Sequence, residues 1–351
     1  MAAAAHNPGV SVSSGALPVW HDGRPRIGIH TSIAGDPCRA LETAHRIGCT
    51  AVQIFSCSPR MWPRPHQLTL SAPVARRFRQ RRAALRLGPV AVHANYLVNL
   101  ATPDPRQWEN AIDGFCYELL RAAQLGADFV IVHPGSPLGA GVDWGISRVA
   151  DAIARASALA GPDGSARVLV ENTAGQGTGM GSRFEHLRRI LDLCAARGVL
   201  PQPGVCLDTA HLIAAGHEIH TAEGLERTIE EIDGVIGLDN VRVIHTNDSK
   251  APCGSRRDRH EHIGRGHIGK EAFARILKHP RLAGPHRAFV LETPIYRPGD
   301  DRRNVRTVWS LLGVSSTPLG RNRNPLRRAP RDAARNRPAR RPHRTSPRSA
   351  R

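Results

Sequence analysis

Paired cysteines, long apolar segments and aromatic residues are absent or scarce in this chain. Its seven cysteines are scattered without C-x-x-C spacing, which argues against a disulfide framework and a cysteine zinc site and favours a reducing cytoplasm. No segment approaches the roughly 18 apolar residues of a membrane span, and no Lys, Arg or secretory apolar stretch precedes Arg24. Aromatic residues make up 4% of the chain, but 40% hydrophobic residues supply an aliphatic core. We expect a globular cytoplasmic protein, nucleoid-associated if the source is bacterial, with no membrane partner.

Acidic residues are few relative to basic ones. The chain of 351 residues has 49 Lys and Arg against 30 Asp and Glu, and its net charge is +19. Residues 317–351 hold 12 Arg and one acidic residue, so this end carries +11 and the rest of the chain +8. This balance favours polyanionic partners, because basic side chains contact phosphates and release counterions.

Both ends of the chain differ in composition from its middle. Residues 1–24 are rich in Ala, Gly, Ser and Pro without periodicity, and we predict a flexible leader. Residues 317–351 have almost no aliphatic residues after Leu326, so they cannot form a core, and we predict a disordered basic tail. The tail could tether the chain to DNA or could be an unimportant extension. The fold is expected within residues 25–316.

Short β-branched runs alternate with helical segments through this middle part. The runs cover residues 26–33, 51–56, 90–96, 129–135, 167–173, 204–209, 241–248 and 288–294. Their near-continuous apolar character is typical of parallel strands buried on both faces. After the first run, Asp36 can cap a helix that starts at Pro37 and stops at Gly48. Eight such βα alternations predict a (β/α)₈ TIM barrel, with an open doubly wound sheet as the alternative.

Side chains that bind metals follow six consecutive predicted strands. They are His93, His133, Glu171, Asp208, His245 and Glu292. Three more lie in the segments after two of these strands: His211, Asp258 and His260. Because the carboxyl ends of barrel strands converge on one mouth, we expect all nine side chains in one pocket.

Each of these residues also has a structural interpretation. His93 or His133 could be a hydrogen-bonded histidine at a strand end, Asp208 could cap a helix, and Glu171 or Glu292 could pair with an arginine. Together they would bring several unpaired charges into one low-dielectric mouth, which is costly unless cations neutralise them. Histidines and carboxylates without cysteine indicate zinc, with manganese or iron as substitutes.

Seven motifs carry a resemblance to a known family. In chain order they are H-A-N-Y-L-V-N-L (93–100), H-P-G-S (133–136), E-N-T-A-G-Q-G (171–177), D-T-A-H with A-A-G (208–216), H-T-N-D-S-K (245–250), G-S-R-R-D-R-H (254–260) and L-E-T-P (291–294). From about residue 27 to about residue 312, the chain resembles the endonuclease IV family of the xylose isomerase-like TIM-barrel superfamily, with the motifs in order and at similar intervals. The resemblance implies a zinc-dependent apurinic/apyrimidinic endonuclease of base excision repair. It would cut duplex DNA 5′ to an abasic site and leave a 3′-hydroxyl and a 5′-deoxyribose phosphate.

The resemblance also implies a site with three zinc ions per chain. One ion would be held by His93, His133 and Glu171, and a second by Glu171, Asp208, His245 and Glu292. The third would be held by His211, Asp258 and His260. Glu171 would bridge the first two ions, and Glu171 and Asp208 would also orient the attacking hydroxide.

Loops around the mouth are expected to select damaged DNA. The segment S-P-R-M-W (58–62) resembles a DNA-penetrating loop in which Arg60 enters the base stack, with Tyr96 and Leu97 as a wedge beside it. Alternatively, Trp62 and Leu97 could pack beneath the loops and Arg60 could contact a phosphate only. Two residues depart from the family pattern near this expected surface, namely Asn95, at a position that is usually small or Pro, and Arg265, at a position that is usually acidic.

Two other functions compete with this prediction. A sugar isomerase or epimerase of the same superfamily also places Glu, Asp and His on successive strands, but it needs no third metal. A non-catalytic nucleic-acid-binding protein would use the basic surface and tail, but it leaves the ligand set unexplained. We expect a monomer, because a flat face must stay open to duplex DNA.

Overall fold

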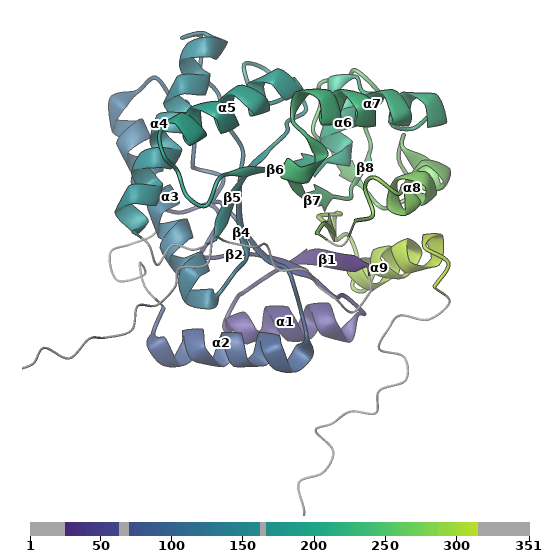
Figure 1. The fold of residues 1–351 in the computed structure, drawn as a ribbon. Helices are drawn as coiled ribbons and strands as arrows, with labels where there is room; N and C mark the ends of the chain where they lie inside the picture. Colours follow the sequence, from purple (N-terminus) through teal and green to yellow (C-terminus); the bar gives the residue numbers. More distant parts are fainter. Residues whose placement is uncertain (1–24, 63–69, 162–165, 285, 315–351) are drawn as a thin grey trace, which may run out of the picture. The chain divides into compact units, whose positions relative to one another are not determined.

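Eight parallel strands pair edge to edge in a closed barrel in the computed structural model, which describes residues 25–62, 70–161, 166–284 and 286–314 (Figure 1). The strands are β1 (Arg26–Thr31), β2 (Val52–Phe55), β3 (Val90–His93), β4 (Phe129–Val132), β5 (Arg167–Glu171), β6 (Gly204–Asp208), β7 (Val241–His245) and β10 (Ala288–Leu291). Their order around the barrel is β1-β10-β7-β6-β5-β4-β3-β2. The predicted leader (1–24) and basic tail (317–351) lie outside the described residues, so both stay predictions.

Pairing between β1 and β10 closes the barrel. Arg26 lies opposite Ala288, and Ile29 lies opposite Leu291. This contact joins the first and last strands, so the alternative of an open doubly wound sheet is wrong.

All eight strands end earlier than predicted. β3, for example, stops at His93 instead of residue 96, and β7 stops at His245 instead of residue 248. The chain leaves the barrel ladder there to form the loops of the mouth. Asp248–Ser249 belongs instead to a separate two-stranded antiparallel ladder, β8, whose partner β9 is His260–Glu261. Hydropathy could not separate these polar strand ends from the loops that follow.

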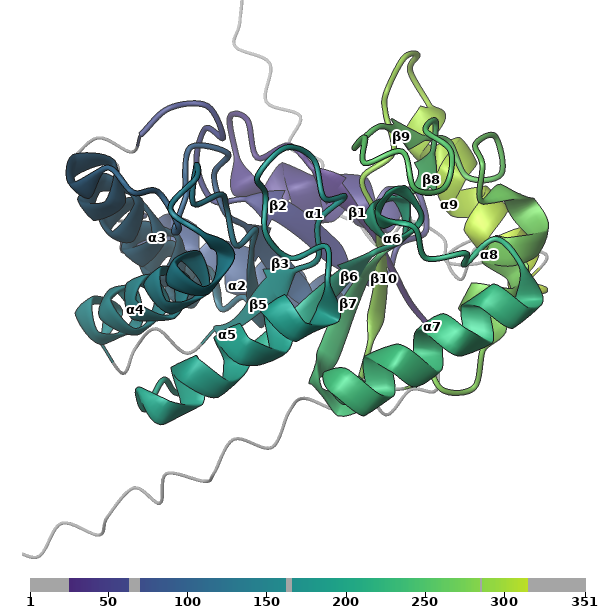
Figure 2. The same ribbon diagram turned by 90° about the horizontal axis from the view of Figure 1, so that it is seen from above.

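Helices surround the barrel strands, as Figures 1 and 2 show. The long helices are α1 (Pro37–Arg46), α2 (Ala72–Leu85), α3 (Pro105–Leu125), α4 (Val142–Ala160), α5 (Phe184–Ala196), α7 (Ala222–Val235), α8 (Gly269–Lys278) and α9 (Asp300–Leu311). A short helix, α6 (Thr209–Ala215), follows β6 directly and packs beside β8 (Figure 2). A 3₁₀ helix, η2 (Leu238–Asn240), precedes β7. Among the described residues, none of the helices combines the length and apolar character that a membrane span needs.

The first βα unit shows how local sequence sets these elements. The side chain of Asp36 accepts a hydrogen bond from the Cys38 amide at 3.0 Å, and Pro37 occupies the first helical position, as predicted. Ala40, Leu41 and Ala44 are fully buried against the barrel. Gly48, with φ of +97°, follows the end of the helix.

The barrel interior is a small apolar core below the mouth. Its members are Ala51, Ala91, Phe129, Ile131, Leu169, Cys206, Val243, Ala288 and Val290. Side chains of a strand alternate between its two faces, so the residue two positions after an inward-facing one also faces inward. The candidate ligands occupy these next inward positions, one layer closer to the mouth.

Candidate metal centre

Six candidate ligands come from the carboxyl ends of six neighbouring strands. His93, Glu171, Asp208 and His245 are the last residues of β3, β5, β6 and β7, while His133 and Glu292 follow β4 and β10 directly. Each lies two residues after a member of the barrel-interior core. The alternation of the strands therefore aims all six into the mouth, as the sequence predicted.

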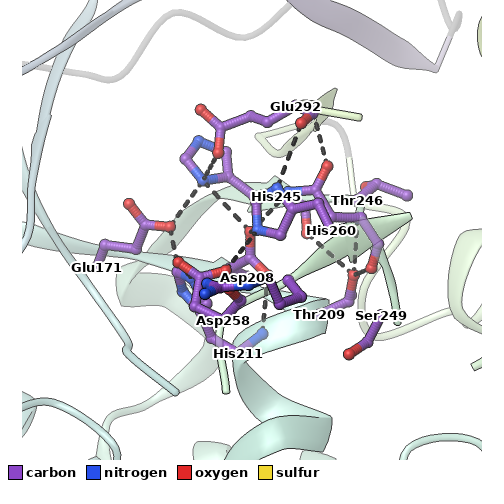
Figure 3. A network of polar contacts seen from close by, with 12 residues as sticks. Glu171, Asp208, Thr209, His211, His245, Thr246, Ser249, Asp258, His260 and Glu292 are labelled. Atoms are coloured by element: carbon purple, nitrogen blue, oxygen red, sulfur yellow. Dashed lines mark hydrogen bonds and ion pairs between the residues drawn. The ribbon is translucent and has the colours of Figure 1, made fainter. Parts of the chain in front are cut away.

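Glu171 stands at the centre of the cluster. Its Oε2 atom lies 3.2 Å from Nε2 of His93 and 3.2 Å from Nε2 of His133. Its Oε1 atom lies 2.8 Å from Nδ1 of His245. Figure 3 shows the Glu171 carboxylate directed at the group formed by Asp208 and its neighbours. Glu171 thus faces two sets of ligands at once, which is what a bridging carboxylate requires.

A second set gathers around His245. Its Nδ1 atom lies 3.3 Å from Oε2 of Glu292 and 3.9 Å from Oδ2 of Asp208, in addition to its contact with Glu171. Asp208 and His245 are fully buried, so these charged and polar atoms are shielded from water.

A third set lies on the other side of Asp208. His260 Nε2 is 3.6 Å from Asp208 Oδ2, and the carboxylate oxygens of Asp258 lie 3.2 Å from His211 Nε2 and 3.3 Å from His260 Nε2. The loop after β7 brings Asp258 and His260 to α6, which carries His211 (Figure 3). All nine predicted ligand residues therefore meet at one mouth.

The donor atoms are close enough for metal binding. Within each of three groups, the ligand atoms all lie within 4.8 Å of one another: His93, His133 and Glu171; Glu171, Asp208, His245 and Glu292; Asp208, His211 and His260. Imidazole nitrogens and carboxylate oxygens are the donors that zinc takes in sites without cysteine. The donor set thus fits three divalent cations that share Glu171 and Asp208 at the borders of the groups.

The electrostatics of the cluster also favour the binding of cations. Burial opposes ionisation of Glu171, but His245 and His133 outweigh it and hold the pKa of this carboxyl well below its usual range. Burial also opposes protonation of His211 and His260, but Asp208 and Asp258 raise the pKa of His211 to about 10 and that of His260 to about 9. In the metal-free chain, protons on His211 and His260 balance the neighbouring aspartates. Bound cations would replace these protons.

Cys206 is a candidate ligand that the sequence analysis did not consider. Its sulfur lies in a further group with Glu171 and His245. Burial raises the pKa of this thiol to about 12, which disfavours the thiolate that a metal would bind. Its side chain belongs to the apolar core of the barrel.

Two asparagines beneath the ligands were also missed. Asn247 Nδ2 donates to Asp208 Oδ2 at 2.6 Å, and its Oδ1 accepts from the Glu292 amide at 2.7 Å. Asn172 Oδ1 accepts from the Asp208 amide at 2.5 Å. Asn172 directly follows Glu171, and Asn247 lies two residues after His245. This closeness to candidate ligands in the chain was the only sequence feature that could have indicated their role. They orient the ligands without facing the mouth, in the manner of outer-shell partners of metal sites.

Asp248 organises the loop that returns to the mouth. This buried carboxylate accepts hydrogen bonds from the main-chain amides of Ser249, Gly264, Gly266 and Ile268 at 2.8 to 3.0 Å. It therefore ties β8 to the segment after β9. Arg265, one of the departures from the family pattern, lies on this segment and is exposed.

The mouth opens into a cavity of about 790 Å³, a size suited to a small ligand. Its lining includes His93, His133, His260 and Glu292 of the ligand set, and Phe55 and Tyr96 from the rim. The side chains of His133 and Asp258 are 39% and 44% exposed, so the cluster is open to solvent on this side.

The proposed DNA-contact residues lie on two linked loops at the rim. Arg60 is exposed, Tyr96 is 65% exposed and Leu97 is 39% exposed. The Tyr96 amide donates to the Pro59 carbonyl oxygen at 3.1 Å, which joins the two loops. The proposed roles of Arg60 in the base stack and of Tyr96 and Leu97 as a wedge stay predictions.

Trp62 packs against a helix, as the alternative interpretation of its side chain predicted. Its ring lies on α3 at Gly114, where a Cβ atom would stand only 2.6 Å from Trp62 Cζ3. Asn95, which the sequence placed near the DNA surface, is 4% exposed and lies between the loops. Its contacts with the 58–62 loop make it a structural residue of the rim.

Comparisons with known proteins agree with this geometry. The family model described as xylose isomerase-like TIM barrel matches residues 41–309. A protein named probable endonuclease 4 from Solibacter usitatus is 48% identical over 298 residues, which are 84% of this chain and 99% of that protein. The crystal structure of endonuclease IV from Thermus thermophilus superposes with a TM-score of 0.72 at 39% identity, and covers 82% of this chain and 99% of its own.

A more distant structure shares the fold alone. A D-tagatose 3-epimerase-like protein superposes with a TM-score of 0.59 at 18% identity, over 82% of this chain and 97% of its own. The fold is thus shared with proteins of low sequence identity. Because a relative of 48% identity spans nearly its whole length on this chain, the chain belongs to the endonuclease IV family of xylose isomerase-like TIM barrels.

Proposed function

We propose that this chain is an apurinic/apyrimidinic endonuclease that hydrolyses the phosphodiester bond 5′ to an abasic site in duplex DNA. The products are a 3′-hydroxyl and a 5′-deoxyribose phosphate, as base excision repair requires. The observation that carries the proposal is the convergence of nine ligand side chains on one open mouth, in three groups that share Glu171 and Asp208.

Three zinc ions would occupy these groups, with manganese or iron as substitutes. The first would be held by His93, His133 and Glu171, and the second by Glu171, Asp208, His245 and Glu292. The third would be held by His211, Asp258 and His260, with Asp208 close to it. Bound zinc would supply Lewis acidity, which lowers the pKa of water and stabilises charge on phosphate oxygens.

The chain's own residues supply orientation. Glu171 and Asp208 place carboxylate oxygens at the borders between the groups, where they would hold and align the attacking water. Asn247 holds Asp208 and the Glu292 backbone, so the carboxylates do not need to rearrange during reaction. His133 and Asp258 keep an exposed side toward the mouth, from which the phosphate would enter.

Damaged DNA would be selected at the rim. Arg60, Tyr96 and Leu97 project from two loops that hydrogen bonds join, so they would act as one unit. Arg60 would enter the base stack and Tyr96 with Leu97 would wedge beside it, while the abasic nucleotide turns into the 790 Å³ cavity. A nucleotide without its base gives up less stacking and pairing when extruded, so selection can rest on deformability.

The second candidate is a sugar isomerase or epimerase, which the shared fold favours. The third ligand group, with His211 and His260, argues against an isomerase, because the enolisation of a sugar needs no third cation. The protein would work as a monomer in the cytoplasm, with its rim open to duplex DNA.

Cleavage of a duplex that carries one tetrahydrofuran abasic analogue tests the proposal. The analogue cannot undergo β-elimination, so any cut is hydrolytic. We expect incision 5′ to the analogue that leaves a 3′-hydroxyl, is lost in Glu171→Gln and persists in Glu230→Gln, which alters an exposed carboxylate of α7. Zinc-loaded protein that binds this duplex without cutting it would refute the endonuclease, and turnover of a ketose would then favour the isomerase.

A further inference from the structure

Gln53 lies in the ring of metal ligands although its strand contributes none. It is on β2, two residues after Ala51 of the barrel-interior core, and so occupies the same layer as His93 on the neighbouring strand. Its side chain is fully buried and contacts residues from three other strands: His245, Glu292 and His30. Burial of a long polar side chain is costly unless its amide group is hydrogen-bonded, and these contacts provide the hydrogen bonds.

The contacts determine which way the amide points. One end of the Gln53 amide lies 2.5 Å from Glu292 Oε1, and a carboxylate can only accept a hydrogen bond. That end is therefore the NH₂ group. His30 Nδ1 lies 3.0 Å from this group and also 3.0 Å from Glu292 Oε1, to which it donates, so His30 and Gln53 hold the same carboxylate oxygen. The oxygen of Gln53 is then the atom that lies 2.8 Å from His245 Nε2.

This orientation determines the tautomer of His245. An amide oxygen has no hydrogen to donate, so Nε2 of His245 must carry the ring proton of the hydrogen bond. The other nitrogen, Nδ1, faces carboxylate oxygens of Glu171 at 2.8 Å, Glu292 at 3.3 Å and Asp208 at 3.9 Å. The opposite tautomer would set the lone pair of Nε2 against the oxygen of Gln53.

We infer that Gln53 is a positioning residue of the metal centre, which holds His245 as the Nε2–H tautomer with Nδ1 as the ligand atom. Its NH₂ group holds Glu292 in place at the same time, so one side chain presets two ligands of one cation. The inference rests on the proposed metal centre, but the role of Gln53 does not follow from that proposal. Outer-shell partners that orient a ligating histidine commonly change metal affinity by about 10- to 100-fold.

Zinc affinity measured by competition with a chromophoric chelator tests the inference. Gln53→Met keeps the size of the side chain and removes both hydrogen bonds. We expect the affinity of one zinc equivalent to fall by about 10- to 100-fold, with the remaining equivalents unchanged. The matched control is Ile54→Val, which alters the next residue of β2 on its helix-facing side and should leave all affinities as in the wild type. Equal zinc affinity of Gln53→Met and the wild type would overturn the inference.

A second measurement needs no variant at position 53. Long-range ¹H–¹⁵N NMR of the zinc-loaded wild type reports which ring nitrogen of each histidine carries a proton, and loss of one signal in His245→Gln assigns it. We expect the proton on Nε2 of His245, and a proton on Nδ1 would overturn the inference even if Gln53→Met does not fold. Wild-type protein that binds no zinc would instead refute the proposed metal centre, so the two failures are distinguishable.

Discussion

Asn95 Nδ2 donates a hydrogen bond of 2.8 Å to the main-chain oxygen of Met61. The same amide group donates to the Ser58 oxygen at 3.3 Å, and Asn95 Oδ1 accepts from the Leu97 amide at 2.8 Å. One buried side chain thus connects the loop of Arg60 with the loop of Tyr96 and Leu97. A small residue or Pro at this position could not make these contacts, so the departure from the family pattern has a structural consequence.

Asn95→Ala should weaken binding to the abasic duplex because the two loops would no longer move as one. We expect a loss of about 1 kcal/mol, roughly fivefold in Kd, which corresponds to one ordinary hydrogen bond. Fluorescence anisotropy with a labelled tetrahydrofuran duplex measures it. Asn240→Ala, which removes an asparagine that donates to the Ile236 oxygen before β7, should leave binding unchanged. An unchanged Kd in Asn95→Ala would contradict the coupling of the loops.

Gly114→Ala and Gly234→Ala form a matched pair on two outer helices. A Cβ atom at Gly234 of α7 meets nothing within 4 Å, so alanine should stabilise the protein by about 0.5 to 1 kcal/mol through its higher helix propensity. At Gly114 of α3 the Cβ atom would stand 2.6 Å from Trp62 Cζ3, so the ring and its loop must shift. We expect Gly114→Ala to lose that gain and to weaken abasic-site binding. Urea unfolding and anisotropy measure both effects, and equal stabilisation by the two substitutions would show that Trp62 does not rest on α3.

The stability of the metal-free protein should fall as the pH rises from 7 to 10. The contacts with Asp208 and Asp258 raise the pKa of His211 to about 10 and that of His260 to about 9, both above the value near 6.5 of an unfolded histidine. Groups whose pKa is raised on folding contribute stability that is complete below the unfolded pKa and is lost as the pH passes the folded one. Thermal unfolding in a chelating buffer at several pH values measures this.

Zinc-loaded protein should show the opposite trend over the same range. Zinc requires neutral imidazole, so the stabilisation that zinc provides should grow with pH as fewer protons must be displaced. A metal-free protein whose Tm rises between pH 7 and 10 would contradict the proposed pairing of His211 and His260 with the two aspartates.

Removal of metal should abolish incision without abolishing DNA binding. Cleavage depends on the ligand cluster, whereas much of the binding to undamaged duplex comes from arginine contacts with phosphates, which need no metal. We expect protein dialysed against EDTA to retain salt-dependent binding in a gel-shift assay, to lose incision, and to regain incision on addition of zinc. Incision at the original rate after complete removal of metal would contradict a metal-dependent mechanism.

Much of the site was predictable because its signals are local. The six candidate ligands at the ends of the barrel strands each follow an aliphatic run of their own strand, so hydropathy and residue type together marked them. The cap at Asp36 and the start of α1 at Pro37 were predictable for the same reason, because a cap and its helix are neighbours in sequence.

The supporting residues were not predictable because their signals are not local. Gln53 and His245 are 192 positions apart, and Gln53 and Glu292 are 239 positions apart, yet each pair is in hydrogen-bond contact. The residues next to Gln53 in β2 do not distinguish it from a polar residue of any other short strand. The buried Asp248 was visible in the motif after β7, but the amides that it binds come from positions 249 to 268 and meet only in the folded loop.

The sequence by itself determined the alternation of strands and helices, the candidate ligands and the family, because strand propensity, helix caps and residue chemistry act over a few residues. Only the tertiary structure decided that β1 pairs with β10 to close the barrel, that Asn95 joins the rim loops, and that Gln53 contacts His245. Those outcomes depend on distances between strands that are remote in the chain. Closure of the barrel brings such strands together, and no local pattern contains that information.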